Sequence, residues 1–480
     1  MNIILVISAL IAVLNIFFSF SLIFIERKDP NTTWAWLLVM IILPGLGFVI
    51  YLLLGQNFSR ERLFKEKKKL DRKKRLEISK SWDFNRGGSR VSAHYIDLIK
   101  MNFNHCEAKY TYRNEINVYY DGPNKFKQLL KDLKNAKKFI HVEYYIFKRD
   151  GKDGIGTKIL DILQQKVEEG VEVRLLVDSM GSYTITKRSL KKFINSKGKF
   201  EIFFPGILPH VNTRVNYRNH RKIVVIDGEY GYVGGFNVGK EYVNLDDSLG
   251  FWRDTHVRIR GEAVNDLNDR FLLDWCYASG EDIEDFGEFY PKEPIRDGDV
   301  GIQIVTSGPD HNEEYIKNAY IKMINNAKKN VYVETPYFVP DGPMLEALRI
   351  SALSGVDVRL IIPGKPDHIF MGWAASAYIG ELLDVGVKVY MYDKGFIHSK
   401  TIVCDSEVST VGTANMDMRS FSLNFEVNAF IYDDRIAIEM QEQFFKDIEE
   451  SKIMTLEEYK DRSLSLRIRE SIIKLISPIL

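Results

Sequence analysis

The pattern His-x-Lys-x-x-x-x-Asp occurs twice in this 480-residue chain and constrains its fold more than any other feature. In each copy a glycine follows fourteen residues after the histidine, and an asparagine follows seventeen residues after it. The matched residues are His220, Lys222, Asp227, Gly234 and Asn237 in the first copy, and His398, Lys400, Asp405, Gly412 and Asn415 in the second. The chain has only nine histidines, so two such strings with matched tails indicate a duplicated unit and a composite site.

The residue types in the motif indicate phosphate chemistry. Each copy runs into an apolar, β-branched segment, which predicts a strand on which His and Lys share a face. The Asp falls in a predicted hairpin turn, and the returning strand would bring the Asn back beside its own His-Lys pair. Two facing copies would gather two imidazoles, two ammonium groups and two carboxamides around an anionic tetrahedral group. One imidazole could attack phosphorus while the other protonates the leaving oxygen.

The duplicated string resembles the HKD motif of the phospholipase D superfamily. This resemblance implies cleavage of a phosphodiester through a phosphohistidine without metal, with both copies of His, Lys and Asp as signature residues. It also implies a carboxylate past each motif that orients the His of the opposite half. Asp254 lies 34 residues after His220, and Glu426 lies 28 residues after His398. Glu426 would then hold His220, and Asp254 would hold His398. The turn position predicts a mainly architectural role for the two motif aspartates.

The motif could also be a surface strand pair or a metal site. A single His-x-Lys on a strand is usually a surface pair, but matched Gly and Asn offsets in two copies argue against that interpretation. Lysine is a poor metal ligand, and the chain has no His-x-x-x-His or Cys-x-x-Cys spacing. The three cysteines, Cys106, Cys276 and Cys404, are scattered, which indicates a reducing compartment and no disulfide framework. We therefore expect no metal or other cofactor, and activity that survives chelation.

The duplication extends beyond the motif. Residues 139–147 resemble residues 331–338, and residues 170–177 resemble residues 355–362. Glu143 and Glu334 recur in the first of these pairs, and we expect them to form structural pairs at strand ends rather than to line the site. Helices over 126–136 and 155–169 should alternate with strands over 139–147 and 171–177. This alternation is typical of an α/β domain.

The N-terminus contains two long uncharged apolar stretches, over residues 3–25 and 34–54. Both reach the roughly 20 residues that a bilayer core demands. A cleaved signal peptide would need a basic start and a small-x-small site, which the first stretch lacks. A pair of buried core helices is the other alternative. Because only a short connector separates the stretches, we predict an uncleaved transmembrane hairpin.

The charges around this hairpin predict its orientation. Residues 60–75 hold ten Lys or Arg against three Asp or Glu, whereas the connector holds only Arg27 and Lys28. The positive-inside rule therefore places both termini and everything after residue 55 in the cytoplasm, which makes the protein a multi-pass protein of the cell membrane. The basic stretch can gather anionic lipid at about 1 kcal/mol per residue, or form a solvated linker. The net charge of +1 gives no reason to expect a nucleic-acid partner.

The predicted fold class is α/β, with two tandem phospholipase D-like α/β domains forming one shared active site behind the transmembrane hairpin. The predicted segments are a hairpin over 1–55, a basic juxtamembrane linker over 56–110, and domains over 111–295 and 296–480. In the tail, Ile468, Ile472, Leu475 and Ile479 recur at helical spacing. That helix could lie on the membrane, but we favour docking on the core.

The chain resembles the bacterial cardiolipin synthases over essentially its whole length. The resemblance includes the hairpin, the basic stretch and the two HKD halves. Further resemblance lies in Thr33-Trp-Ala-Trp-Leu-Leu, Ser307-Gly-Pro-Asp and Pro336-Tyr-Phe-Val-Pro. The resemblance implies that one phosphatidylglycerol gives its phosphatidyl group to the enzyme and loses glycerol. A second phosphatidylglycerol then attacks through a hydroxyl to give cardiolipin. Both lysines, with Asn237 and Asn415 binding the phosphate, would stabilise charge on its oxygens.

Other functions would use the same motif. A phospholipase D hydrolase would use water as the acceptor, and another phosphatidyltransferase would use a different alcohol. A nucleic-acid phosphodiesterase would need no hairpin, and a non-catalytic scaffold would not need two intact motifs. The hairpin and the intact motifs therefore favour lipid transfer.

Overall fold

The computed structural model describes residues 3–26, 30–51, 64–65, 67–69, 71, 91–205, 216–246, 248, 250–293, 295, 297–311 and 313–477. Parts of three predicted segments lie outside these residues: the end of the second apolar stretch, most of the basic stretch after Arg60, and the last three residues of the tail. Within the described part, helices and strands alternate through both halves of the chain.

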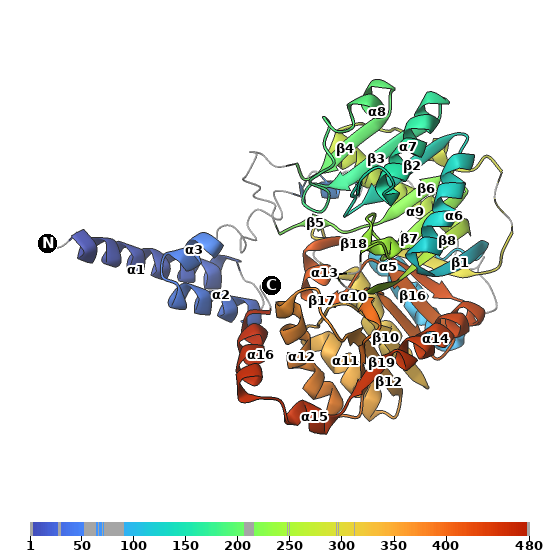
Figure 1. Ribbon diagram of the computed structural model, residues 1–480. Coiled ribbons are helices and arrows are strands. Elements are labelled where there is room, and N and C mark those ends of the chain that lie inside the picture. The colour runs from blue at the N-terminus through green and yellow to red at the C-terminus, as the bar shows by residue number, and fades with distance from the viewer. Residues whose placement is uncertain are drawn as a thin grey trace.

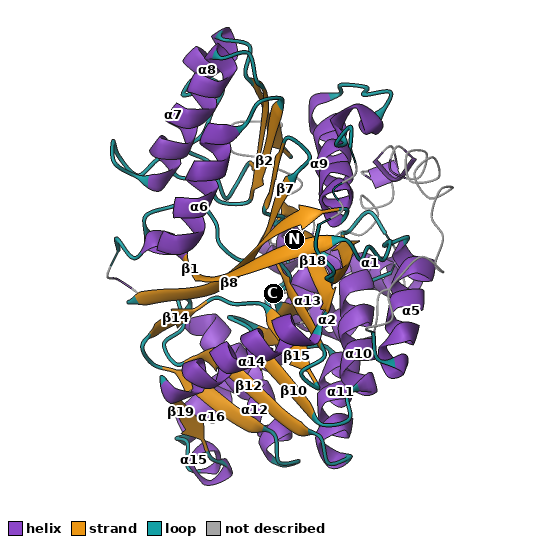
Figure 2. Ribbon diagram, turned by 90° about the vertical axis from the view of Figure 1, so that its right-hand side faces the viewer, coloured by secondary structure: helices purple, strands orange, loops and turns teal. Residues whose placement is uncertain are grey.

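The first half is built on one mixed sheet with the strand order β1-β8-β7-β6-β2-β3-β4. Its strands are β1 (Asn114–Asp121), β2 (Phe139–Tyr144), β3 (Glu172–Asp178), β4 (Lys199–Phe203), β6 (Ile223–Ile226), β7 (Tyr230–Gly234) and β8 (Phe251–Gly261). Strands β2, β3 and β4 are parallel, and the others pair antiparallel. Helices α6 (Gly122–Asn135) and α7 (Ile155–Glu168) lie on one face and α9 (Ala263–Ser279) on the other (Figure 2). Helix α8 (Lys191–Asn195) precedes β4.

The second half repeats this connectivity in the order β19-β13-β12-β10-β15-β16-β18, with β9 on the far side of β18. Its strands are β9 (Gly301–Ser307), β10 (Asn330–Glu334), β12 (Asp357–Pro363), β13 (Lys388–Tyr392), β15 (Thr401–Cys404), β16 (Val408–Gly412), β18 (Asn424–Tyr432) and β19 (Ser451–Met454). Its helices are α10 (Tyr315–Asn326), α11 (Gly342–Leu353), α12 (Ile369–Leu383), α13 (Met418–Ser422) and α14 (Asp434–Glu449). The short strands β11 (Phe338–Val339) and β17 (Met416–Asp417) pair beside it. The predicted α/β duplication is therefore confirmed.

The predicted elements of the first half are present with shifted ends. Helix α6 begins before its predicted start because the Asp121 carboxylate caps it and accepts a hydrogen bond from Asn124 N at 2.8 Å. Helix α7 and strand β3 match their predictions closely. Strand β2 ends at Tyr144, and Phe147 returns only as an isolated bridge to Val238.

The two halves share one hydrophobic core. The inward faces of both sheets meet there, with Ile223 and Val225 from the first half and Val403 and Val411 from the second. The halves also exchange short strands. β5 (Arg218–Asn219) of the first half pairs in parallel with β18, and β14 (Gly395–Ile397) of the second pairs in parallel with β8. Figure 2 shows β8 and β18 running between the halves. Both motif histidines therefore lie at a seam made by the two halves together.

Part of the predicted linker is folded into the second half. The 3-10 turn η4 (Ala93–Tyr95) continues into α5 (Ile96–Cys106), which packs on α10 and β9, and Tyr95, Leu98 and Ile99 are buried in the core of the second half. Gln303 of β9 donates to the Ile99 and Ala108 carbonyl oxygens, which fixes this segment. The folded body therefore begins before residue 111.

The N-terminal helices project from the side of the folded body (Figure 1). They are α1 (Ile3–Ser21), continued by the π-helical turn η1 (Leu22–Glu26), then α2 (Pro30–Ile42) and α3 (Leu46–Ile50). Leu22, Trp36, Met40 and Tyr51 form a small buried cluster between them. Among the described residues, no helix has both the length and the apolar character needed to cross a membrane. The transmembrane hairpin stays a prediction.

The tail folds as α15 (Leu456–Lys460) and α16 (Leu464–Ile476). Helix α16 docks on α12, with Ile473 buried and Glu470 accepting from Arg462 and Ser376 at 2.6 Å each. The tail helix therefore docks on the core as we favoured, while Ile468 and Ile472 on its outer face remain exposed.

Candidate active site

His220 and Glu426 form one imidazole–carboxylate pair across the seam. His220 follows β5, and its backbone N–H donates to the Phe425 carbonyl oxygen at 2.9 Å. Its Nδ1 lies 2.9 Å from Glu426 Oε2 and 3.0 Å from Oε1. We assign the proton to Nδ1, because a carboxylate can only accept. The Nε2 atom then carries the lone pair that can face a substrate.

His398 and Asp254 form the reciprocal pair. His398 follows β14, and its backbone N–H donates to the Arg253 carbonyl oxygen at 2.6 Å. Its Nδ1 lies 2.6 Å from Asp254 Oδ2, while Asp254 Oδ1 accepts from Thr255 N at 2.7 Å. Each half therefore orients the histidine of the other with a carboxylate from its own longest sheet strand, β8 or β18.

The motif lysines lie beside these pairs and are fully buried. Lys222 Nζ donates to the His220 carbonyl oxygen at 2.8 Å. Lys400 Nζ donates to the His398 carbonyl oxygen and lies 2.8 Å from His398 Nδ1. Burial, together with repulsion from Lys400, lowers the pKa of Lys222 to about 7 despite Glu426. Burial lowers the pKa of Lys400 to about 8 despite the nearby carboxylates.

Both imidazoles have a lowered pKa. Burial is the main cause for His220, with further contributions from Lys222 and Lys400, and it outweighs the Glu426 carboxylate. Burial and Lys400 lower the pKa of His398 to about 4 against the effect of Asp254. Lysines of both halves act on both histidines, so the four side chains share one electrostatic environment. A bound anion would favour their charged forms.

The two asparagines that follow the motifs make different contacts. Asn237 Oδ1 accepts from Ile146 N at 3.2 Å, and its Nδ2 donates to Tyr242 Oη at 3.2 Å. Asn415 Oδ1 is buried and has no hydrogen-bond partner among the described residues. This oxygen can accept a hydrogen bond from a bound substrate hydroxyl.

The motif aspartates lie away from the imidazoles, in the turns at the far ends of β6 and β15. Asp227 accepts from the backbone N–H groups of Lys137, Lys138 and Phe139 at 2.7 to 3.0 Å. It lies five positions along extended chain from Lys222, about 16 Å away at roughly 3.3 Å per position. Its φ of 56° fits the tight turn.

Asp405 repeats this arrangement in the second half. It accepts from the backbone N–H groups of Lys328, Lys329 and Asn330 at 2.6 to 3.1 Å, and from Tyr95 Oη at 3.1 Å. Both aspartates thus tie the motif hairpin to the start of the neighbouring strand, which is an architectural function.

Comparison with known proteins identifies the family. A family model described as "Cardiolipin synthase, PLD-like domain" matches residues 129–275 and 320–448, and a phospholipase D-nuclease N-terminal model matches residues 13–56. The chain is 52% identical over 95% of its length to cardiolipin synthase from Clostridium perfringens, of which 96% is covered. It is 48% identical to the major cardiolipin synthase of Bacillus subtilis, over 98% of both chains. The chain belongs to the cardiolipin synthase family.

A solved structure shares the fold. The phosphatidylserine synthase of Haemophilus influenzae superimposes with a TM-score of 0.57 at 16% identity, covering 80% of this chain and 99% of that one. The phospholipase D-like fold inferred from the HKD motif is confirmed by this likeness and by the family model.

The sequence alone did not single out several side chains around the family's motif. The Tyr145 ring lies edge-on to His220 with centroids 4.9 Å apart, and the Trp252 ring lies 5.2 Å from His398. Tyr145 follows β2 and meets His220 of its own half across 75 residues of sequence, whereas Trp252 on β8 meets His398 of the other half. No local pattern in the sequence marks either contact.

The recurring glutamates are structural, as the strand-end pairing predicted. Glu143 accepts from Asn219 Nδ2 at 2.5 Å, and Glu334 accepts from Thr401 Oγ1 at 2.9 Å. Burial is the main cause that raises the pKa of Glu143 to about 8 and the pKa of Glu334 to about 7. Each therefore supports the segment that carries a motif histidine.

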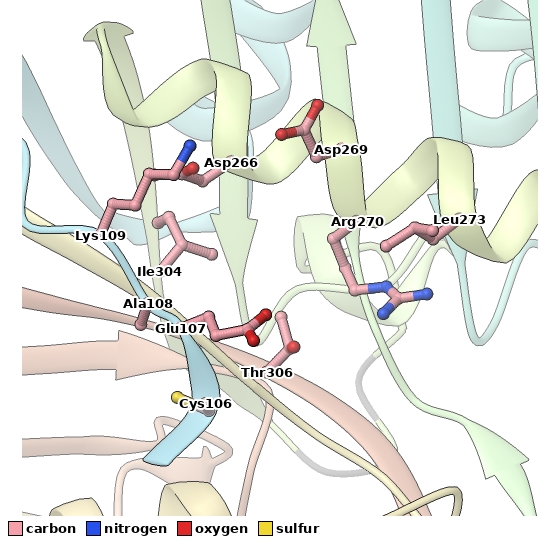
Figure 3. Close-up of a pocket in the computed structure, with 10 residues that line it drawn as sticks. All are labelled: Cys106, Glu107, Ala108, Lys109, Asp266, Asp269, Arg270, Leu273, Ile304 and Thr306. Carbon is pink, nitrogen blue, oxygen red and sulfur yellow. The ribbon is translucent and has the colours of Figure 1, made fainter. Parts of the chain in front are cut away.

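A separate cavity of about 70 Å³ lies between α9 and the segment after α5 (Figure 3). None of the predicted site residues lines it. It is lined by Asp266 and Asp269, whose pKa burial raises to about 6 and about 7. Glu107 adds a third carboxylate against Lys109 and Arg270, so the lining offers no excess of positive charge for a phosphate.

Metal ligands are not clustered in the described ranges. No group of three or more His, Cys, Asp or Glu side chains there could hold a metal ion. The three cysteines are free and buried.

Proposed function

We propose that this chain synthesises cardiolipin by moving a phosphatidyl group from one phosphatidylglycerol to another through a phosphohistidine. The observation that carries the proposal is the reciprocal pairing of His220 with Glu426 and of His398 with Asp254, beside two buried lysines. Two oriented imidazoles on one anion site suit a two-step displacement at phosphorus.

In the first step, His220 Nε2 attacks phosphorus and forms a P–N bond. The P–O bond to the glycerol headgroup breaks, and protonated His398 gives its proton to the departing oxygen. Glu426 stabilises the positive charge that develops on His220. We assign the nucleophile by resemblance to the family, because the two pairs are nearly equivalent in geometry.

In the second step, neutral His398 takes the proton from a hydroxyl of the second phosphatidylglycerol. The oxygen attacks phosphorus, the P–N bond breaks, and His220 is regenerated with cardiolipin as product. Asp254 holds His398 in the orientation needed for both proton transfers. Lys222 and Lys400 stabilise the negative charge on the non-bridging oxygens, and the amides of Asn237 and Asn415 support them.

We further propose that the N-terminal helices embed the protein in the membrane that holds its substrate. Helices α1 and α2 expose many large apolar side chains, among them Leu10, Val13, Phe17, Trp34 and Ile41. Such a surface is unfavourable in water and marks a site of membrane or protein contact. The proposed arrangement is a multi-pass hairpin that leaves both catalytic halves in the cytoplasm next to anionic lipid.

The test uses the purified full chain with phosphatidylglycerol labelled in the glycerol headgroup or in the acyl chains. We expect the headgroup label to divide equally between free glycerol and the bridging glycerol of cardiolipin, and the acyl label to appear in cardiolipin. Phosphatidic acid as the main product would instead identify a hydrolase. A different phosphatidyl ester, formed only when another alcohol is added, would identify a different acceptor.

A further inference from the structure

A short part of the basic stretch is buried inside the folded body. We call it the neck, meaning the described residues between Phe64 and Asp71. Phe64, Lys67 and Asp71 are at most 2% exposed, whereas Lys65, Lys68 and Lys69 are exposed. A fully buried lysine is rare unless it is paired. The neck therefore has one face inserted in the protein and one in solvent.

The buried face contacts the strand that carries Glu426. The Phe64 ring lies 5.6 Å from the Phe425 ring of β18, 5.2 Å from Tyr217 and 5.9 Å from Phe204. Lys67 Nζ lies 5.2 Å from the centroid of the Phe425 ring. Phe425 is also the residue whose carbonyl accepts the His220 N–H.

Lys67 is the centre of a buried ion network. Its Nζ lies 2.8 Å from Asp71, 3.0 Å from Asp310 and 3.4 Å from Asp274. Arg270 bridges the same carboxylates, at 3.0 Å from Asp71 and 2.8 Å from Asp274. Its guanidinium turns away from Asp269 of the separate cavity (Figure 3).

Arg221 joins this network to the catalytic pair. Its Nη1 donates to Asp274 at 2.5 Å, and its Nε donates to the Glu426 carbonyl oxygen at 3.1 Å. Arg221 directly follows His220 in sequence. The three cations, Lys67, Arg221 and Arg270, balance the three carboxylates, Asp71, Asp274 and Asp310. Loss of Lys67 would leave one buried carboxylate without compensation, which is costly.

The second half has no neck residue at the equivalent place among the described residues. Arg253 precedes Asp254 in β8, as Phe425 precedes Glu426 in β18. Arg253 Nη2 lies 2.7 Å from Asp447 and 3.5 Å from Glu334. Ser399 takes the place of Arg221 and hydrogen-bonds Thr255 at 2.7 Å. His398 is thus supported from within the two halves, whereas the support of His220 includes a residue that precedes them.

We propose that Lys67 is a positioning residue, and that seating of the neck beneath Phe425 and Arg221 holds the His220–Glu426 pair in its reactive geometry. This role rests on the proposed transferase function. It couples the membrane-proximal segment to His220 and not to His398.

The test compares Lys67→Met with Lys68→Met in the full-length protein, assayed on phosphatidylglycerol in mixed micelles. Both variants remove one charge from the same segment, but only the first leaves a buried site. We expect Lys67→Met to lower kcat about ten- to hundred-fold with little change in KM, because small misplacement of a reacting group has effects of that size. Lys68→Met should cost far less. The acid limb of the Lys67→Met pH profile should move up toward the ordinary histidine pKa, as His220 loses its enclosure.

Hydrogen exchange gives a readout that does not depend on activity. Lys67→Met should speed exchange in β5 and at residues 424–427, but not in β14 or at residues 252–254. Equal loss of protection in both places would mean general destabilisation and would overturn the proposal, as would unchanged kcat and pH profile in a folded Lys67→Met protein.

Paired neutralisation keeps the test decisive if the single variant does not fold. Lys67→Met/Asp310→Asn removes the cation together with one carboxylate, so the buried charge is again balanced. We expect this protein to recover most of the kcat and the exchange protection of β5. Recovered folding without recovered kcat would contradict the proposal. If the wild-type protein released phosphatidic acid instead of making cardiolipin, the proposed function would fail, whereas the exchange pattern would still test the role of the neck.

Discussion

At the scale of single residues, the site consists of two imidazoles whose direct contacts within the site are nearly the same. Each donates through Nδ1 to a buried carboxylate of the other half, and each has a lysine two residues later. The chemistry nevertheless needs one of them to attack and the other to carry protons. The two histidines must therefore differ in what their removal leaves behind.

We expect His220→Ala and His398→Ala each to abolish turnover, because neither step is complete without both imidazoles. Only the variant that keeps the nucleophile should still form an acid-labile phosphatidyl adduct. Acid quench with lipid labelled on phosphorus, followed by peptide mapping, detects the adduct and the peptide that carries it. Substantial synthase activity in His220→Ala would mean that the motifs work as separate centres.

A substitution at Gly235 tests the placement of Asp254. A Cβ at position 235 would lie 1.9 Å from Asp254 Oδ1. That carboxylate is already held by Thr255 and His398, so it cannot move without losing a bond. We expect Gly235→Ala to lower kcat about ten- to hundred-fold. Gly342→Ala is the matched control, since its Cβ would meet nothing within 4 Å. Equal activity of the two variants would show that Asp254 has room to shift.

The lysines predict the alkaline side of the pH profile. Lys222 and Lys400 have pKa values lowered to about 7 and about 8. Only the protonated forms attract phosphate, so kcat/KM should fall as pH rises through this window. Lys222→Arg, if active, should shift the fall to higher pH because guanidinium stays charged. If kcat/KM stayed constant up to about pH 9, its fall could not be assigned to the two lysines.

At the scale of elements, the motif hairpins are fastened by their aspartates. Asp405 accepts three backbone N–H groups and the Tyr95 hydroxyl, and it thereby joins β15, β10 and η4. These hydrogen bonds lower its pKa although burial opposes them. Its contribution to stability is therefore present above the unfolded pKa and lost as pH falls through the folded one.

We expect Asp405→Ala to lower the free energy of unfolding by about 3 kcal/mol, because several backbone donors lose their acceptor. The folded fraction should keep kcat within a few-fold of the wild-type protein. Denaturant unfolding and active-site titration measure the two quantities, and Tyr95→Phe serves as the milder control. A large loss of kcat at unchanged stability would instead make Asp405 part of the chemistry.

At the scale of the whole molecule, the orientation of the chain in the membrane follows from the position of the basic stretch. The N-terminal helices project from the body on the side where α16 also lies (Figure 1). Reporter fusions at Met1 and after Leu480 should both give cytoplasmic signals, because the basic stretch after Arg60 should stay on that side. An external signal from the C-terminal fusion would contradict the proposed orientation.

The sequence by itself determined the repeated unit, the α/β alternation and the motif residues, because these depend on local spacing and on strand and helix periodicity. It also indicated that Asp227 and Asp405 lie in turns, since a turn is formed by neighbouring residues. The pairing of Glu426 with His220 came from family resemblance and not from spacing.

Only the tertiary structure decided which strands the halves exchange, how far burial lowers the lysine pKa values, and that Lys67 is inserted beneath Phe425. Residues that are hundreds of positions apart make these contacts, and their geometry depends on how two complete sheets pack together. No local pattern distinguishes Lys67 from Lys68, because burial is a property of the assembled fold.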